Sequence, residues 1–440
     1  MKTTFLFAHI FTVFGFALPS LAATTEFDTA KELKNGASET IVQGDEWKFL
    51  SGSSLLVENS VLNVDGTITN VGATTFRFDS RNSTGSVVTF DGGKFLNENT
   101  AGTTNIIVGQ DTNTCPLLFE LKNGASIGNN PAVSGVKNLD IEFGRNTDTT
   151  INIDKTSSIT ATTINYSTRG WNASPVVNNF NINGGTVSLS NNLNVATAGQ
   201  LANNSGILAN ISINGGGRLT TLNATILNQA GKADNEANRV FVTVKDIGSS
   251  FSVSNNLSLG PTSVENSESV AELILHTGAS ATVGATLTVN NHGAVRAVLD
   301  SDTISSNAPL LSTNNASLYN NSGADAAFVI DGELLGASGS FEKDMTYDFV
   351  LFEVKSGQVG LNGTSKSMSD ADFLDDISTF ISFENNTGNS FWKDFGVDDL
   401  FVVDGNRIGV SLTYAVPEPG AYAAIFGALA LFLAACRRRK

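Results

Sequence analysis

The chain has 440 residues, a formal net charge of −16 at pH 7 and only 15% charged residues. This acidic balance argues against nucleic acid or an anionic membrane face as a partner, because both carry negative charge. Regular β-branched residues and few charges favour folded β structure over disorder. Between the two ends Cys115 is the only cysteine, which excludes an intramolecular disulfide there.

Residues 1–22 have the pattern of a secretory signal peptide. Lys2 precedes an apolar core from Phe5 to Leu18, and Pro19 is followed by the small-residue pattern Ser20-Leu21-Ala22. This order predicts export from the cytoplasm, with cleavage after Ala22 or Ala23. An uncleaved anchor is the alternative, but the apolar core is short and a cleavage pattern follows it.

Residues 23–50 are predicted to form an N-terminal cap for the repeats that follow. A stack of repeats exposes apolar side chains at its first member, so that end must be covered. The segment FDTAKEL, Phe27 to Leu33, has the composition of a short amphipathic capping element.

Residues 51–325 contain internal repeats of about 30 residues. VSLSNNLNV (Val187 to Val195) recurs as FSVSNNLSL (Phe251 to Leu259), and ELKNGAS occurs identically at 32–38 and 120–126. Each repeat has an alternating strand, a turn of Asn, Asp, Gly or Ser, and another alternating strand. The first apolar residue after the turn recurs at Ile68, Phe95, Ile127, Ile159, Val187, Leu219, Phe251 and Ala281.

A repeat of this length is too short for a β-sandwich and suits one coil of a solenoid with two or three short strands. We therefore predict an all-β fold, a right-handed parallel β-helix with coils about 4.8 Å apart. Asn at stacked turns can form amide ladders, and Gly tolerates left-handed corners. A twisted antiparallel stack of hairpins has the same periodicity and stays open as the alternative.

Residues 326–414 follow a different pattern. VLFEV, FISF and LFVV are apolar runs, and SDADFLDD, Ser369 to Asp376, resembles a capped helical turn. We predict a β-rich C-terminal cap region that closes the stack of coils.

Residues 415–440 form a tail of three parts. Pro417-Glu418-Pro419 precedes 17 uncharged residues, Gly420 to Cys436, which end at the basic cluster Arg437, Arg438, Arg439 and Lys440. The apolar run is at the lower limit for one transmembrane helix, and the cations favour a cytoplasmic end. The prolines keep the preceding segment extended and accessible to a protease. A plain tail anchor is the alternative.

This order of motif, apolar span and Arg cluster resembles the PEP-CTERM sorting domain of Gram-negative-type bacteria. The resemblance covers about 25 of the 440 residues. It implies an exosortase-like processing enzyme as partner, membrane attachment through the C-terminal helix before processing, and removal of the tail. It also implies delivery to the cell envelope surface or the extracellular matrix, often alongside exopolysaccharide. It implies nothing about the function of the residues that precede the tail.

Catalytic and metal-binding patterns are sparse in this sequence. Outside the signal peptide the histidines are His276 and His292, and both lie in turns. Two isolated histidines do not make a metal site. No Ser-His-Asp grouping, phosphate-binding loop or zinc spacing occurs. We expect no catalytic residue, no metal and no cofactor.

The enzymatic alternative is a polysaccharide lyase or a glycosidase, an analogy at the level of the fold alone. A glycosidase needs two carboxyl groups about 5–10 Å apart, and a calcium-dependent lyase needs clustered acids beside an Arg or Lys. The candidate acids are Asp91, Asp154 and Asp246 at equivalent turns, Asp300 and Asp302 near Arg296, and Asp370, Asp372, Asp375 and Asp376 as a possible Ca²⁺ group.

We expect instead a structural or adhesive surface protein. Repeated turns with hydroxyl and amide groups suit weak multivalent contacts with exopolysaccharide. The chain offers few aromatic platforms for sugars, with three Trp and five Tyr. A stripe of aromatics would indicate a specific binder, a concave cluster of acids an enzyme, and neither of these a scaffold.

Overall fold

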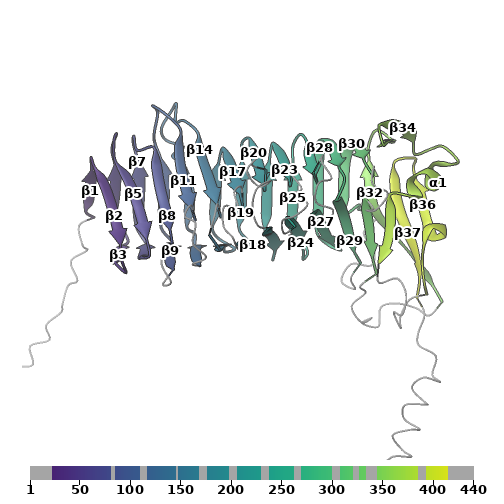
Figure 1. Cartoon of the computed structure of the whole chain (residues 1–440), viewed down its shortest axis with the longest axis horizontal. Coiled ribbons are helices and arrows are strands. Elements are labelled where there is room, and N and C mark those ends of the chain that lie inside the picture. The colour runs from purple at the N-terminus through teal and green to yellow at the C-terminus, as the bar shows by residue number, and fades with distance from the viewer. Residues whose placement is uncertain are drawn as a thin grey trace, which may run out of the picture.

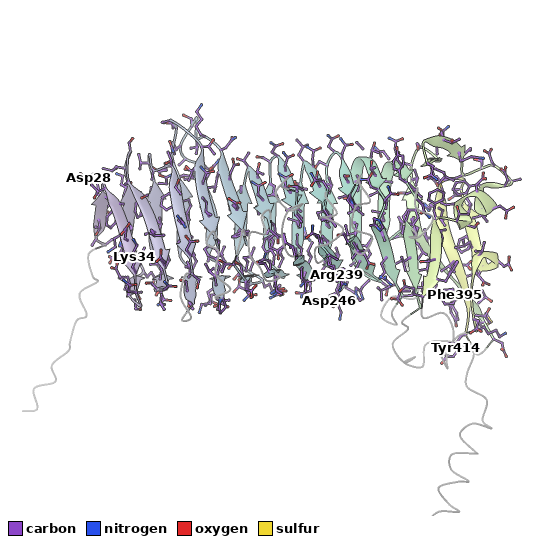
Figure 2. All side chains as sticks on the ribbon, in the orientation of Figure 1. Asp28, Lys34, Arg239, Asp246, Phe395 and Tyr414 are labelled. Carbon is purple, nitrogen blue, oxygen red and sulfur yellow. The ribbon has the colours of Figure 1, made fainter. Side chains whose placement is uncertain are left out.

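The computed structural model describes residues 22–80, 85–109, 116–144, 147–167, 176–197, 206–228, 237–261, 269–299, 308–320, 327–332, 344–384 and 393–414. These residues form one rod of stacked coils, with β1 at one end and β36 and β37 at the other (Figure 1). Asp28 and Lys34 lie at the first end, and Phe395 and Tyr414 at the far end (Figure 2). Each coil contributes one short strand or half-strand to each of three stacks. Within a coil, these three strands follow one another along the chain.

The first stack pairs twelve strands or half-strands in parallel. They are β1 (Thr24–Phe27), β4 (Glu46–Phe49), β7 (Thr67–Asn70), β10 (Lys94–Asn97), β13 (Ser126–Asn129), β16 (Ser158–Ala161), β19 (Thr186–Leu189), β22 (Arg218–Thr221), β25 (Ser250–Val253), the first halves of β28 (Ser280–Val289) and β30 (Leu311–Leu318), and β32 (Thr346–Val354).

The eight repeat positions read from the sequence all lie in this first stack. Each one pairs with the next, from Ile68 opposite Phe95 to Phe251 opposite Ala281. The prediction of parallel coils is thereby confirmed, and the antiparallel alternative is wrong for the stacked coils. The handedness of the winding stays a prediction.

The second stack follows the first within each coil. It contains β2 (Ala30–Lys34), β5 (Ser54–Glu58), β8 (Thr75–Asp79), β11 (Thr104–Val108), β14 (Leu139–Phe143), β17 (Thr163–Tyr166), β20 (Asn192–Val195), β23 (Asn223–Ile226), β26 (Leu257–Leu259), the second halves of β28 and β30, and β33 (Gln358–Leu361). The first and second stacks belong to one 25-stranded sheet, because β28 and β30 run through both.

The third stack is a separate 12-stranded sheet. It contains β3 (Ser38–Ile41), β6 (Val61–Val64), β9 (Ser86–Asp91), β12 (Leu117–Lys122), β15 (Thr149–Ile153), β18 (Val176–Asn183), β21 (Ile207–Asn214), β24 (Arg239–Val244), β27 (Val270–His276), β29 (Gly293–Val298), β31 (Phe328–Asp331) and β35 (Ile381–Glu384). Twelve coils at about 4.8 Å per step give a rod on the order of 50 Å long.

The two segments expected as caps both contain stacked strands. Residues 23–50 hold β1 to β4, and β1 and β2 pair in parallel with β4 and β5 of the next coil. In residues 326–414, β31, β32, β33 and β35 continue the three stacks.

Antiparallel strands are added only in this last region of the part of the chain that the structure describes. β37 (Arg407–Thr413) pairs with β32 and β36 (Leu400–Val403), and β34 (Thr364–Ser367) with β33. A short helix, α1 (Phe373–Ser378), and a 3-10 turn, Val397–Asp399, complete it. α1 begins after Asp372, which makes no side-chain capping bond.

The interior contains one continuous apolar column, because alternate residues of most stacked strands point inward. Aromatic rings link successive coils through it. Phe119 lies with its ring centroid 5.8 Å from that of Phe90 and 5.9 Å from that of Phe143, and Phe143 lies 5.5 Å from Phe180. Burial of this column is the main force that holds the coils in register.

No helix among the described residues is long and apolar enough to cross a membrane. The predicted C-terminal span, residues 420–436, and the rest of the tail lie outside those residues.

Candidate functional site

Of the two predicted processing sites, the described residues include only the N-terminal one. Ala22 and Ala23 are exposed, and Ala23 donates its backbone N–H to Asp45 Oδ1 at 3.0 Å. β1 begins directly after them, at Thr24. Pro417, Glu418, Pro419 and the basic cluster from Arg437 to Lys440 lie outside the described residues.

The two histidines occupy separate positions in the rod. His276 ends β27 and stands opposite Val298 in the third stack. His292 is buried, at 5% exposure, in the turn between β28 and β29, with a positive φ of 57°. Across the described ranges, no group of three or more His, Cys, Asp or Glu side chains is arranged to hold a metal ion.

The acids at equivalent turns serve as hydrogen-bond acceptors for the corners of the coils. Asn123 donates its side-chain amide to Asp91 at 2.6 Å and its backbone N–H to Asp154 at 2.7 Å. The side-chain bond from Asn123, and after it the bond from Lys122, lower the pKa of Asp91. Partial burial acts to raise the pKa of Asp154, but bonds from Ser157, Asn123 and Thr156 outweigh it and lower that pKa. Both groups are therefore poor general acids.

Asp246 and Asp376 are likewise tied to their local structure, whereas Asp370, Asp372 and Asp375 are exposed. Asp246 accepts the backbone N–H of Gly215 at 3.0 Å. Asp376, in α1, pairs with Lys366 of β34 at 2.7 Å. Asp300 and Asp302 lie outside the described residues.

Arg296 lies at the centre of a cluster that spans four coils of the third stack. Its guanidinium bonds to Glu272 on β27 at 3.0 and 3.1 Å, to Asp331 on β31 at 3.3 Å, and to Glu384 on β35 at 2.5 Å. The side chains of Arg296, Glu272 and Asp331 are 9–16% exposed. The sequence pattern pointed to Arg296 but not to Glu272, Asp331 and Glu384 as its partners.

This cluster is unsuited to proton abstraction. Burial alone would lower the pKa of Arg296, but hydrogen bonds to Glu272 and Glu384 raise it above its ordinary value. A guanidinium in that state does not lose its proton and cannot act as a base. The cluster therefore ties β27, β29, β31 and β35 together.

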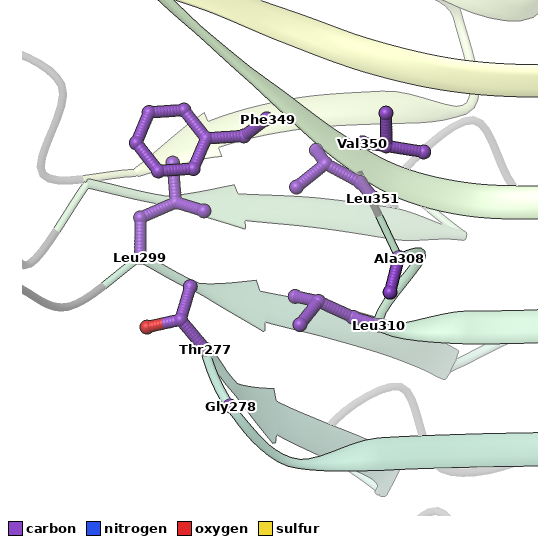
Figure 3. Close-up of a pocket in the computed structure, with 8 residues that line it drawn as sticks. All are labelled: Thr277, Gly278, Leu299, Ala308, Leu310, Phe349, Val350 and Leu351. Carbon is purple, nitrogen blue, oxygen red and sulfur yellow. The ribbon is translucent and has the colours of Figure 1, made fainter. Parts of the chain in front are cut away.

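A small hollow lies where the terminal region meets the rod (Figure 3). It has about 260 Å³ of space, including the part open to solvent, and is lined by Thr277, Gly278, Leu299, Ala308, Leu310, Phe349, Val350 and Leu351. None of these eight lining residues is charged. Leu299 and Ala308 flank residues 300–307, which lie outside the described residues.

A regular polar surface of the rod is the outward face of the second stack from β17 to β30. Its side chains are all amides or hydroxyls, which we call the amide–hydroxyl face. They are Thr163, Asn165, Asn192, Asn194, Asn223, Thr225, Ser258, Thr286, Thr288, Asn315 and Ser317. The face begins beyond β14, whose outward residues are the acids Asp140 and Glu142.

Hydrogen bonds between coils fix the amide part of this face. Asn194 donates to Asn165 at 2.9 Å, and Asn223 donates to Asn192 at 3.2 Å. Asn255, from the next turn, donates to Asn223 at 2.9 Å. Amide ladders of this kind were expected from the sequence, although it placed them at turns rather than on a strand face.

The hydroxyl part of the face runs straight along the rod. Thr225 stands opposite Ser258, Ser258 opposite Thr288, and Thr288 opposite Ser317. The side chains of Thr225, Thr288 and Ser317 lie on the partly exposed side of their strands and make no hydrogen bond to another side chain within the described ranges. These residues all belong to strands with an alternating sequence pattern. That they line up on one face can be seen only once the register between the coils is known.

Comparison with known proteins gives no relative: no family model matches the chain, and no curated protein or solved structure is detectably similar.

Proposed function

We propose that the chain is an exported surface or matrix protein, a rigid rod that an exosortase-like enzyme releases from its membrane tail. It acts as a structural or adhesive component associated with exopolysaccharide. The observation that carries this proposal is the order of Pro417-Glu418-Pro419, apolar span and basic cluster in the sequence shortly after β37, Arg407–Thr413.

The geometry of the rod supports a mechanical role. Three parallel stacks over twelve coils give a stiff element with a single apolar interior. The predicted signal cleavage at Ala22 or Ala23 leaves β1 whole, because β1 starts at Thr24. We further propose right-handed winding, since parallel crossover connections have that hand in nearly all known cases.

The lyase or glycosidase alternative receives less support. Asp91 and Asp154 both accept hydrogen bonds from Asn123, and Arg296 is held by three carboxylates. A plain tail-anchored surface protein differs from our proposal only in keeping the tail.

Cell fractionation tests the proposal. A variant with Pro417, Glu418 and Pro419 all changed to Ala is compared with Val416→Ala in the native cells. We expect the triple variant to stay in the membrane fraction and the control to reach the outer surface or medium. Equal distribution of the two variants would count against recognition of the motif.

A further inference from the structure

We propose that the amide–hydroxyl face binds an extended, uncharged polysaccharide chain lying along the rod axis. This inference rests on the proposed surface location and adds the binding surface and the class of partner.

The charge distribution selects an uncharged partner. The chain carries a net charge of −16, yet the outward side chains of β17, β20, β23, β26 and the second halves of β28 and β30 include no charged group. An anionic polymer would be repelled by the protein as a whole. An uncharged, hydroxyl-rich chain meets donors and acceptors on the face without the cost of desolvating an ion.

The face is already ordered before any partner binds. The bonds from Asn194 to Asn165 and from Asn223 to Asn192 hold those amides in place. A rigid surface loses little side-chain entropy on association. The hydroxyls of Thr225, Thr288 and Ser317, which bond to no described side chain, are exchanged from water to sugar at small cost.

The absence of aromatic side chains among the outward residues of these strands shapes the expected affinity. Without stacking, each sugar contact is weak, and binding depends on many contacts made together. The face covers six successive coils, which at about 4.8 Å per step is about 24 Å. Affinity should therefore rise with the length of the polysaccharide until the chain spans that distance.

A matched pair of variants tests this surface. Thr225→Lys places a cation on the face, whereas Thr243→Lys places the same cation on the same coil but on the outward side of β24 in the third stack. The full chain in detergent is titrated with hydroxyethyl cellulose, glucomannan and a β-1,3-glucan, with their short oligomers, and with alginate as the anionic comparison.

We expect the natural protein to bind at least one of the uncharged polymers, its oligomers more weakly, and alginate least. Thr225→Lys should weaken binding at least tenfold, and Thr243→Lys less than twofold. Thr288→Lys replaces Thr225→Lys if the latter melts at a lower temperature than the control.

Lack of binding to all three uncharged polymers, equal loss in both variants, or tighter binding to alginate would overturn the inference. These measurements use purified protein, so they do not depend on whether the tail is processed. A retained tail with face-dependent binding would refute the proposed processing alone.

Discussion

Phe119 lies on β12 with its ring among those of Phe78, Phe90 and Phe143, and it is fully buried. Its neighbour Leu118 points outward on the same strand. At the scale of the residue, this alternation decides which side chains hold the coils together, since only the inward ones lose their contact with water.

Replacing Phe119 by Ala should therefore cost about 3–5 kcal/mol of unfolding free energy, through lost burial and the cavity left in the column. Leu118→Ala, the control, should cost less than about 1 kcal/mol because its side chain is partly exposed. Urea denaturation of both variants measures the difference. Similar losses would show that the inward and outward assignment of β12 is wrong.

Glu353 links the last coil to the antiparallel strand that covers it. It accepts hydrogen bonds from Ser312 at 2.6 Å and from Arg407 at 3.2 Å. The Ser312 bond, and after it Arg407, lower the pKa of Glu353 below its ordinary value. A carboxylate with a lowered folded pKa stabilises the protein above its ordinary pKa of about 4.5 and loses that effect as the pH falls through the folded value.

Glu353→Gln should thus lower the urea midpoint at pH 7 and have a much smaller effect at a pH below the folded pKa. Glu32→Gln, on the first coil, controls for the change in net charge. A difference between Glu353→Gln and the natural protein that is the same at both pH values would contradict this linkage.

At the scale of the element, buried amides set the register between coils. Asn97 on β10 accepts from Asn70 at 3.1 Å and from Thr104 at 2.8 Å, and it donates to Asn129 at 2.8 Å. Asn97, Asn70 and Thr104 are completely buried, so the bonds among them cannot be replaced by bonds to bulk water, whereas Asn129 is exposed. A ladder of this kind penalises any slip of one coil past the next.

Asn97→Ala should destabilise the protein by about 1–3 kcal/mol for each buried partner left without a bond. Asn194→Ala removes one bond of the half-exposed outer ladder and should cost less, because water replaces the lost amide there. Thermal unfolding of the two variants checks the order. A larger loss for Asn194→Ala would refute the role of the buried ladder.

The sequence predicts the elements well where strand alternation repeats, and all eight repeat positions pair as expected. Identical local sequence is a weaker guide to position within a coil. The two ELKNGAS segments share a turn, with φ of 58° and 83° at Asn35 and Gly36 and 56° and 83° at Asn123 and Gly124. The first joins the second stack to the third, and the second joins the third to the first.

The Arg296 cluster could not be predicted in the same way. Its partners lie 24, 35 and 88 residues away along the chain. These separations depend on how much chain each coil loops out between its strands, and periodicity carries no information about that. The hydroxyl column from Thr225 to Ser317 is hidden for a similar reason, since Thr and Ser replace one another along it at unequal spacings in the sequence.

At the scale of the whole molecule, the rod separates two expected processing points, Ala22–Ala23 before its first strand and Pro417–Pro419 beyond its last. Our account treats the rod as the mature protein and both flanking segments as temporary. The most direct measurement is the intact mass of the protein recovered from its native cell surface. We predict a chain that starts near Ala23 or Thr24 and lacks the residues after about Pro419. A chain that retains Arg437 to Lys440 would contradict the account and leave an ordinary membrane-anchored rod.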